Sequence, residues 1–521
     1  MKPPRFLYCI ATALFVLVVL TPILYMLLSL LNTDGVGGAL NHISLFDRRQ
    51  IGLAGNSLGT ALGATAGCLL IGPPLAYLLL RTDLWGKNVL KVLCLVPMLI
   101  PPYVHAIVWN DVSRTLGDRF PLDVHSVWGV VFVLTLAYFP FVMLMTLSGL
   151  ESIDRNMEEA SLLHHGEWAT LRRVTLPLAT PHILSGAVFV FIFALTDFSV
   201  PDILRVRVYP VEIFVQFSAF YNEAGAMMLS LPLMAITFLL VLVQRRILKD
   251  RSYVNMYGGR SNASHHCLGR WNICVLMLTL VVVGLSVATP IWDLMERAGA
   301  LSNYIRVLKT SYSQILYSLF VSSIGAAATL FLGLLLAIVI ERSRSEKVKS
   351  IFLYAAIAPL AVPATTLGIG LIRVWNRPAT DFVFESTWVT VFGYVARFLP
   401  FAVMAVASNL KQISPRIEEA AALATSHWLR VLGRIVLPLL SPGLTVGFFV
   451  VLILSFGEIG TTLLVIPPGR ETIPIKIYNL MHYGANSMVA ALSLMLIVII
   501  LALAGMFSAV YGRLSERVSG R

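Results

Sequence analysis

The sequence has 521 residues, of which 57% are hydrophobic and only 13% are charged, and its formal net charge is +12. Soluble chains carry roughly 25% charged residues, so this chain could not cover a water-exposed surface. Basic loops at a membrane face account for the positive charge, and no basic stripe lies beside base-stacking aromatic residues, so we expect membrane lipid and no nucleic acid as partner. We predict an all-α integral membrane protein.

Twelve apolar runs are long enough to cross a bilayer as helices, which takes about 20 residues each. The first six runs are 6–31, 54–80, 91–112, 127–150, 182–204 and 225–244. The second six are 271–294, 315–340, 351–374, 386–408, 442–465 and 486–511. The first run exceeds the roughly 7–15 apolar residues of a signal peptide, so we expect it to be retained. Gly and Pro inside several runs predict kinks or close helix contacts.

The chain repeats itself at an offset of about 261 residues. Arg81 matches Arg342, and Pro140-Phe141 matches Pro400-Phe401. This repeat predicts two homologous six-helix halves, residues 1–244 (core about 54–244) and 271–521 (core about 315–511), joined by a basic linker at 245–270. An even number of spans per half gives the two halves the same orientation in the membrane.

The distribution of Lys and Arg predicts the orientation. Roughly twice as many basic residues fall in the segments on the N-terminal side of the membrane as in those on the other side, and Arg397 lies within a span. The positive-inside rule therefore predicts that both termini are cytoplasmic.

The segment between the fourth and fifth spans of each half carries the most specific motif. The first copy, 158–181, contains Glu158-Glu159-Ala160, Gly166, Trp168 and Leu176-Pro177. The second copy, 418–442, contains Glu418-Glu419-Ala420-Ala421, Trp428 and Leu437-Pro438. Acidic residues favour the N-terminal end of a helix, so each copy predicts a short cytoplasmic helix.

These segments resemble the Glu-Ala-Ala loop of binding-protein-dependent ABC importer permeases, which continues with a Gly and ends in Ile-x-Leu-Pro. In the first copy His164 stands at the usual Gly position, and in the second Ala424 or Thr425 does. The resemblance implies that each loop helix seats on a cytoplasmic ATP-binding cassette subunit, and that an extracytoplasmic solute-binding protein delivers the substrate. It also implies a multi-pass permease of a bacterial inner membrane. No GxxxxGK[ST] phosphate loop occurs in the chain, so separate subunits are expected to hydrolyse ATP.

Fused two-half permeases of this kind resemble those for ferric iron, with thiamine, polyamine, phosphonate and sulfate permeases as relatives. The resemblance therefore implies ferric iron as substrate, with the other solutes as alternatives. The outer loops 202–225 and 467–484 are candidates for contacts with the binding protein by location. The chain itself is expected to be a transport subunit without catalytic residues, cofactor or bound metal.

Two acids at matching places inside the fifth and eleventh spans are candidates for the translocation path. Asp197 and Glu458 are ionisable groups within apolar runs, where charges are costly and often functional. Either they line the path, or they bond to neighbouring backbone near the outer interface. Arg397 either reaches toward the interface or pairs with an acid.

A secondary transporter driven by an ion gradient is the main alternative from another functional class. It would also have twelve spans in two halves, but it gives no reason for two cytoplasmic Leu-Pro helices. A membrane-embedded enzyme would need a cluster of His, Asp, Glu or Ser, and the ten histidines are scattered.

Overall fold

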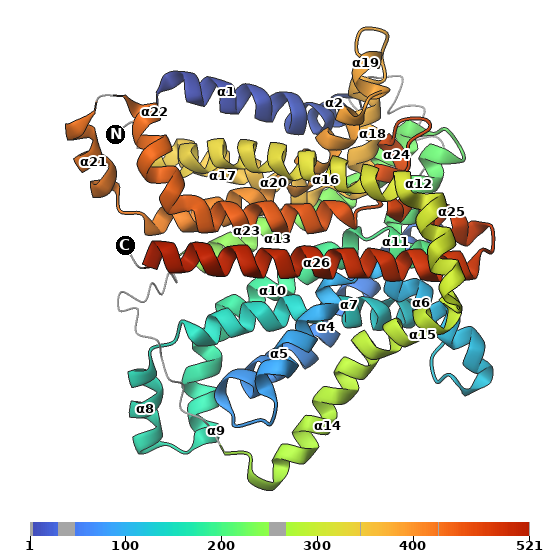
Figure 1. Cartoon of the computed structure of the whole chain (residues 1–521), viewed down its shortest axis with the longest axis horizontal. Coiled ribbons are helices and arrows are strands. Elements are labelled where there is room, and N and C mark those ends of the chain that lie inside the picture. The colour runs from blue at the N-terminus through green and yellow to red at the C-terminus, as the bar shows by residue number, and fades with distance from the viewer. Residues whose placement is uncertain (1–3, 30–46, 250–266, 344, 426, 520–521) are drawn as a thin grey trace. The chain divides into compact units, whose positions relative to one another are not determined.

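The structure is a computed structural model that describes residues 4–29, 47–249, 267–343, 345–425 and 427–519. The described chain is all-α (Figure 1). Ten of its helices are long and apolar enough to cross a membrane, and two further bent helix pairs bring the number of candidate spans to twelve. The predicted all-α fold of about twelve spans is thus confirmed. Most of the predicted linker, residues 250–266, lies outside the described residues.

The helices of the first half begin with α1 and end with α13. They are α1 Arg5–Phe15, α2 Thr21–Ser29, α4 Arg48–Arg81, α5 Lys87–Leu95, α6 Pro102–Leu116, α7 Val127–Glu151, α8 Arg155–His164, α9 Glu167–Thr170, α10 Leu176–Thr196, α11 Ser199–Ile203, α12 Tyr209–Ser218 and α13 Glu223–Lys249.

The helices of the second half follow the same order. They are α14 Asn272–Val283, α15 Thr289–Ala298, α16 Leu301–Arg342, α17 Glu346–Ile357, α18 Ala364–Trp375, α19 Asp381–Phe384, α20 Thr387–Gln412, α21 Pro415–Ala424, α22 Trp428–Val431, α23 Leu437–Phe456, α24 Thr462–Val465, α25 Ile473–His482 and α26 Asn486–Ser519.

The third and ninth predicted spans are each two helices that meet at a sharp bend. The bend is 93° between Lys87–Leu99 and Pro102–Arg119, and 106° between Glu346–Ala361 and Ala364–Trp375. The ring of a proline disfavours helical backbone at the residue before it. Ile100 and Val362, which precede Pro101 and Pro363, are accordingly extended, with ψ of 117° and 123°. The prolines therefore set both bends.

A single π-helical turn precedes a proline at four places in the described part of the chain. The turns are Val16–Leu20 before Pro22, Leu171–Thr175 before Pro177, Gly284–Ala288 before Pro290, and Leu432–Val436 before Pro438. Proline has no N–H to donate to the preceding turn, and its ring clashes with the carbonyl four residues back. The wider turn admits the ring without breaking the helix. Candidate spans therefore run unbroken over Glu167–Thr196 and Trp428–Phe456, starting earlier than the predicted 182–204 and 442–465.

The chain folds into two compact units, each of which takes residues from both sequence halves. One unit consists of 44–212 and 232–296. In its core, α4 packs along α7, and Gly72 lies so close to α7 that an added Cβ would be 2.9 Å from the backbone nitrogen of Met143. Val283 and Val287 of the seventh span belong to the same buried cluster. The first span of the second half therefore packs with helices of the first half.

The other unit consists of 1–43, 213–231 and 297–521. Here α16 packs along α20, and Gly333 repeats the close approach of Gly72, because an added Cβ would be 2.8 Å from Cβ of Ala402. The first span joins this unit, with α1 on α16 and α2 on α18 (Figure 1). The guanidinium of Arg377 lies 4.8 Å from the ring centre of Tyr25. Each half thus contributes its first span to the unit built mainly from the other half.

Candidate functional site

The short helices α8 and α21 hold the predicted motif, and both begin at a capping side chain. Asp154 accepts a hydrogen bond from the backbone N–H of Asn156 at 3.0 Å, and Ser414 accepts one from that of Arg416 at 3.4 Å. Such caps satisfy backbone donors that have no partner inside the helix. Each helix ends at an extended residue, His165 or Thr425. The predicted short helices are therefore present in both copies.

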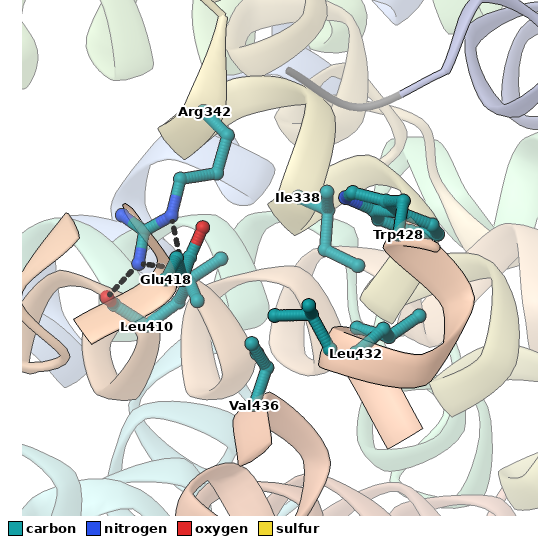
Figure 2. A pocket seen from close by; sticks show the side chains of 8 residues that line it. Ile338, Arg342, Leu410, Glu418, Trp428, Leu432 and Val436 are labelled. Carbon is teal, nitrogen blue, oxygen red and sulfur yellow. Dashed lines mark hydrogen bonds and ion pairs between the residues drawn. The ribbon is translucent and has the colours of Figure 1, made fainter. Parts of the chain in front are cut away.

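The first glutamate of each copy is buried and forms an ion pair with the arginine that ends the second span of its half. Glu158 is 5% exposed and Glu418 is 6% exposed. A terminal nitrogen of Arg81 lies 3.0 Å from Glu158, and the corresponding nitrogen of Arg342 lies 2.7 Å from Glu418 (Figure 2). These two glutamates therefore point into the protein, toward helices that lie far away in sequence.

Further hydrogen bonds support each ion pair. Arg81 donates to the carbonyl oxygen of Leu150 at 2.9 Å, and the hydroxyl of Thr175 donates to Glu158 at 2.9 Å. Arg342 donates to the carbonyl oxygens of Leu410 at 3.3 Å and Ile413 at 3.1 Å. These carbonyls lie at the ends of α7 and α20, where a helix leaves its last carbonyl groups without internal donors. The arginine in each half therefore joins the ends of two helices to the start of a third.

The opposite faces of α8 and α21 present apolar side chains away from the protein. Leu163 is 83% exposed and Leu423 is 92% exposed. Ala160, Glu419 and Ala420 are also exposed. Sequence reasoning did not select the two leucines, although they occupy matching places in the two copies. Large apolar residues exposed at the same place twice are typical of a partner surface.

The two tryptophans of the motif differ in their surroundings. Trp428 lines a small pocket together with Ile338, Leu432 and Val436, beside the Arg342–Glu418 pair (Figure 2). The matching pocket of the first half is lined by Tyr77, Arg81, Glu158, Leu162, Glu167, Thr170, Leu171 and Thr175. Trp168 is not among these residues and is 74% exposed. The repeat predicts equal roles for the tryptophans, whereas the structure gives them different environments.

The other motif residues are exposed or half-buried. Gly166 has extended backbone, with φ of −67° and ψ of 166°, which any residue can adopt. Leu176-Pro177 and Leu437-Pro438 follow the two π-helical turns, and both prolines are exposed. Ala421 is half-buried on α21, and Glu159 is half-buried on α8.

Asp197 and Glu458 lie where the fifth and eleventh spans end. Asp197 is half-buried and accepts hydrogen bonds from the N–H of Val200 at 2.9 Å and from the hydroxyls of Ser199 and Tyr138, both at 3.2 Å. It thereby gives an acceptor to a backbone N–H in the first turn of the short helix α11. The predicted span 182–204 continued through this residue, whereas α10 ends at Thr196.

Glu458 has the corresponding arrangement in the second half and is only 6% exposed. It accepts hydrogen bonds from the N–H groups of Thr461 at 2.7 Å and Thr462 at 3.0 Å, at the start of α24. The hydroxyl of Thr462 also bonds to it. Nε of Arg397 lies 3.6 Å from the Glu458 carboxylate, so of the two expectations for Arg397 the structure shows the ion pair. These contacts give both acids local partners, and their place on a translocation path stays a hypothesis.

Comparison with known proteins places the chain in a family. A family model described as binding-protein-dependent transport system inner membrane component matches residues 59–253 and again residues 329–519. The Fe(3+)-transport system permease protein FbpB 2 of Haemophilus influenzae is 24% identical over 496 residues, which cover 92% of this chain and 93% of that protein. The ferric transport system permease protein FbpB of Actinobacillus pleuropneumoniae is 23% identical over 458 residues, 81% of this chain and 66% of that protein.

A relative with another named function matches a smaller part of the chain. The putative 2-aminoethylphosphonate transport system permease protein PhnV of Salmonella typhimurium is 26% identical over 250 residues, 47% of this chain and 92% of that protein. The family model covers most of the chain in two copies, in agreement with the repeat, the span number and the paired motif. The chain therefore belongs to the family of binding-protein-dependent transport system inner membrane components and is an ABC importer permease with both halves in one polypeptide.

Proposed function

We propose that this permease carries ferric iron across the membrane, driven by two separate cytoplasmic ATPase subunits and supplied by an extracytoplasmic binding protein. The observation that carries the choice of iron is the extent of the similarity. The ferric-transport relative from Haemophilus influenzae aligns across both halves of this fused chain, over 92% of its length. The phosphonate-transport relative aligns over 47%, and a probable molybdenum permease of Haloferax volcanii over 32%.

The coupling to ATPases rests on the geometry of α8 and α21. Each of these helices exposes one large leucine, Leu163 or Leu423, on the side opposite its buried glutamate. An apolar side chain on an exposed helix face is the kind of anchor that fits a groove on a partner. Two such helices, one from each half, fit two copies of an ATPase. Both motif copies and both termini lie on the side of the membrane whose segments hold roughly twice as many Lys and Arg residues, so we place them in the cytoplasm.

The experiment is affinity purification of the tagged chain in mild detergent, followed by mass spectrometry and by uptake of radioactive ferric iron in cells. An ATPase subunit that co-purifies, together with ATP-dependent iron uptake, is the expected result. If the cells take up phosphonate or molybdate but not iron, the proposed substrate is wrong and the solute that is taken up replaces it. Transport that survives ATP depletion but stops when the ion gradient collapses would overturn the proposal in favour of a secondary transporter.

A further inference from the structure

We propose that the Arg81–Glu158 and Arg342–Glu418 pairs are the links through which each ATPase-coupling helix moves the second span of its own half. The four residues are positioning residues, since none of them touches a substrate. This inference rests on the proposed function, because it takes α8 and α21 as the helices that the ATPases move. It adds the route by which that movement enters the membrane helices.

The pairs connect helices that the chain itself does not connect at this point. The backbone joins α8 to α7 before it and to α9 after it. In the second half it joins α21 to the corresponding helices, α20 and α22. Arg81 ends α4 and Arg342 ends α16, and neither helix adjoins a coupling helix in sequence. The ion pair is therefore a direct tie from the coupling helix to the long second span.

Burial and bonding make this tie stiff. Both glutamates and Arg81 are buried, so water competes weakly for their bonds, and each arginine places a terminal nitrogen against the carboxylate of its glutamate. Each arginine also bonds to carbonyls at the end of α7 or α20. Three helix ends therefore meet at one guanidinium in each half, and a displacement of the coupling helix reaches the other two.

The ion pair is present in both halves, but the hydrogen bonds to its glutamate differ. In the first half the hydroxyl of Thr175 gives Glu158 a second donor. Val436 occupies the matching position in the second half and has no hydroxyl. There Arg342 donates to Glu418 through Nε at 2.8 Å and also approaches it with a terminal nitrogen. The link is thus present in both halves although its supporting residue is not.

The test compares transport with ATPase binding in the full transporter. Glu418→Gln keeps the shape of the side chain but removes its charge. If the pair carries the movement, its loss should uncouple ATP hydrolysis from transport. We therefore expect uptake to fall while the ATPase subunits still co-purify and hydrolyse ATP. Arg342→Lys, which keeps a positive charge beside Glu418 and a donor for the carbonyls at the end of α20, should retain part of the uptake. Glu346→Gln, which breaks the surface pair with Lys349, is the control and should leave uptake unchanged.

A distance measurement reports on the link directly. Spin labels at Arg416 on α21 and at Phe331 on α16, both exposed, should give one narrow distance that is the same with and without trapped ATP. In Glu418→Gln the distribution should broaden. If this variant fails to reach the membrane, Arg342→Met/Glu418→Leu replaces the pair with apolar side chains, which buried sites often tolerate, and it should insert but lose uptake.

Three outcomes would overturn the inference. Normal uptake with an unchanged distance in either variant would show that the pair transmits nothing. Loss of ATPase co-purification in Glu418→Gln would show that the glutamate acts at the partner surface. A wild-type chain that brings down no ATPase would remove the proposed function and the inference together, whereas the first two results remove the inference alone.

Discussion

Asn272, at the start of the seventh span, is hydrogen-bonded to the backbone beside Asp83, in the loop that follows the second span. Its side-chain nitrogen donates to the Asp83 carbonyl oxygen at 3.1 Å, and its side-chain oxygen accepts from the N–H of Trp85 at 3.2 Å. The Asp83 carboxylate accepts from the N–H of Leu268 at 2.8 Å. The loop that follows Arg81 therefore also anchors the end of the linker between the halves.

Replacing Asn272 with Ala should destabilise the protein, because it leaves two backbone groups without their partners. Asn272 is 2% exposed, and a hydrogen bond contributes about 0.5–1.5 kcal/mol net, so the loss of both bonds should be measurable. The midpoint of thermal unfolding in detergent should fall clearly. Asn303→Ala, which removes a single hydrogen bond to the Ala298 carbonyl, is the matched control and should cost less. Equal midpoints for the Asn272 variant and the wild type would show that its two hydrogen bonds to the Asp83–Trp85 loop do not stabilise the protein.

Replacing Pro438 with Ala should change the orientation of α22 without weakening the helix. Alanine supplies the missing N–H, and the helix interior prefers it to proline by about 3 kcal/mol. Without the ring, the π-helical turn Leu432–Val436 can close to a regular turn. Loss of its extra residue rotates the preceding segment by about 100°, since a regular turn holds about 3.6 residues.

We therefore expect Pro438→Ala to be at least as stable as the wild type but to transport poorly. Thermal unfolding and uptake, measured on the same preparation, check the two effects separately. Pro73→Ala is the control, because α4 continues through Pro73 without a π-helical turn. A stable Pro438 variant with full uptake would show that the turn has no part in coupling.

The number of spans could be predicted from the sequence because bilayer thickness fixes the length of an apolar run. The repeat could be predicted because matching residues recur in order at one offset. The bends at Pro101 and Pro363 were only partly predictable. Proline marks where a helix is interrupted, but α4 passes straight through Pro73. A proline inside an apolar run can therefore accompany a bend, a π-helical turn or an unbroken helix, and the run alone does not tell these apart.

The ion pairs could not be predicted, although all four residues belong to the detected repeat. Arg81 and Glu158 are far apart in sequence, and the helix pattern alone allows the glutamate to face either the partner or the protein. The packing of each first span with the unit built mainly from the other half could not be predicted either. Hydropathy says that a helix is buried in lipid or protein but not which helices it packs against.

Introducing a charge at Leu423 should weaken binding of the ATPase without affecting the fold. Leu423 is 92% exposed, and substitutions at such positions usually change stability by about 0.5 kcal/mol or less. Leu423→Asp should reduce the amount of co-purified ATPase, because a carboxylate is costly to bury in an apolar groove. Leu423→Met keeps the apolar volume and should bind normally. Retention of the ATPase by Leu423→Asp together with Leu163→Asp would exclude both helices as docking sites.

Asp197→Asn and Glu458→Gln separate a structural role from a place on the translocation path. Glu458 is the more buried acid and is paired with Arg397, so its neutralisation leaves a cation without its partner and should destabilise the protein more than Asp197→Asn does. Arg397→Met/Glu458→Gln removes both charges, keeps an acceptor for the N–H groups of Thr461 and Thr462, and should recover part of the lost stability. If the acids line the path, this double variant will fold but transport poorly. If they only cap α11 and α24, uptake per folded molecule will equal that of the wild type, and the path hypothesis will be excluded.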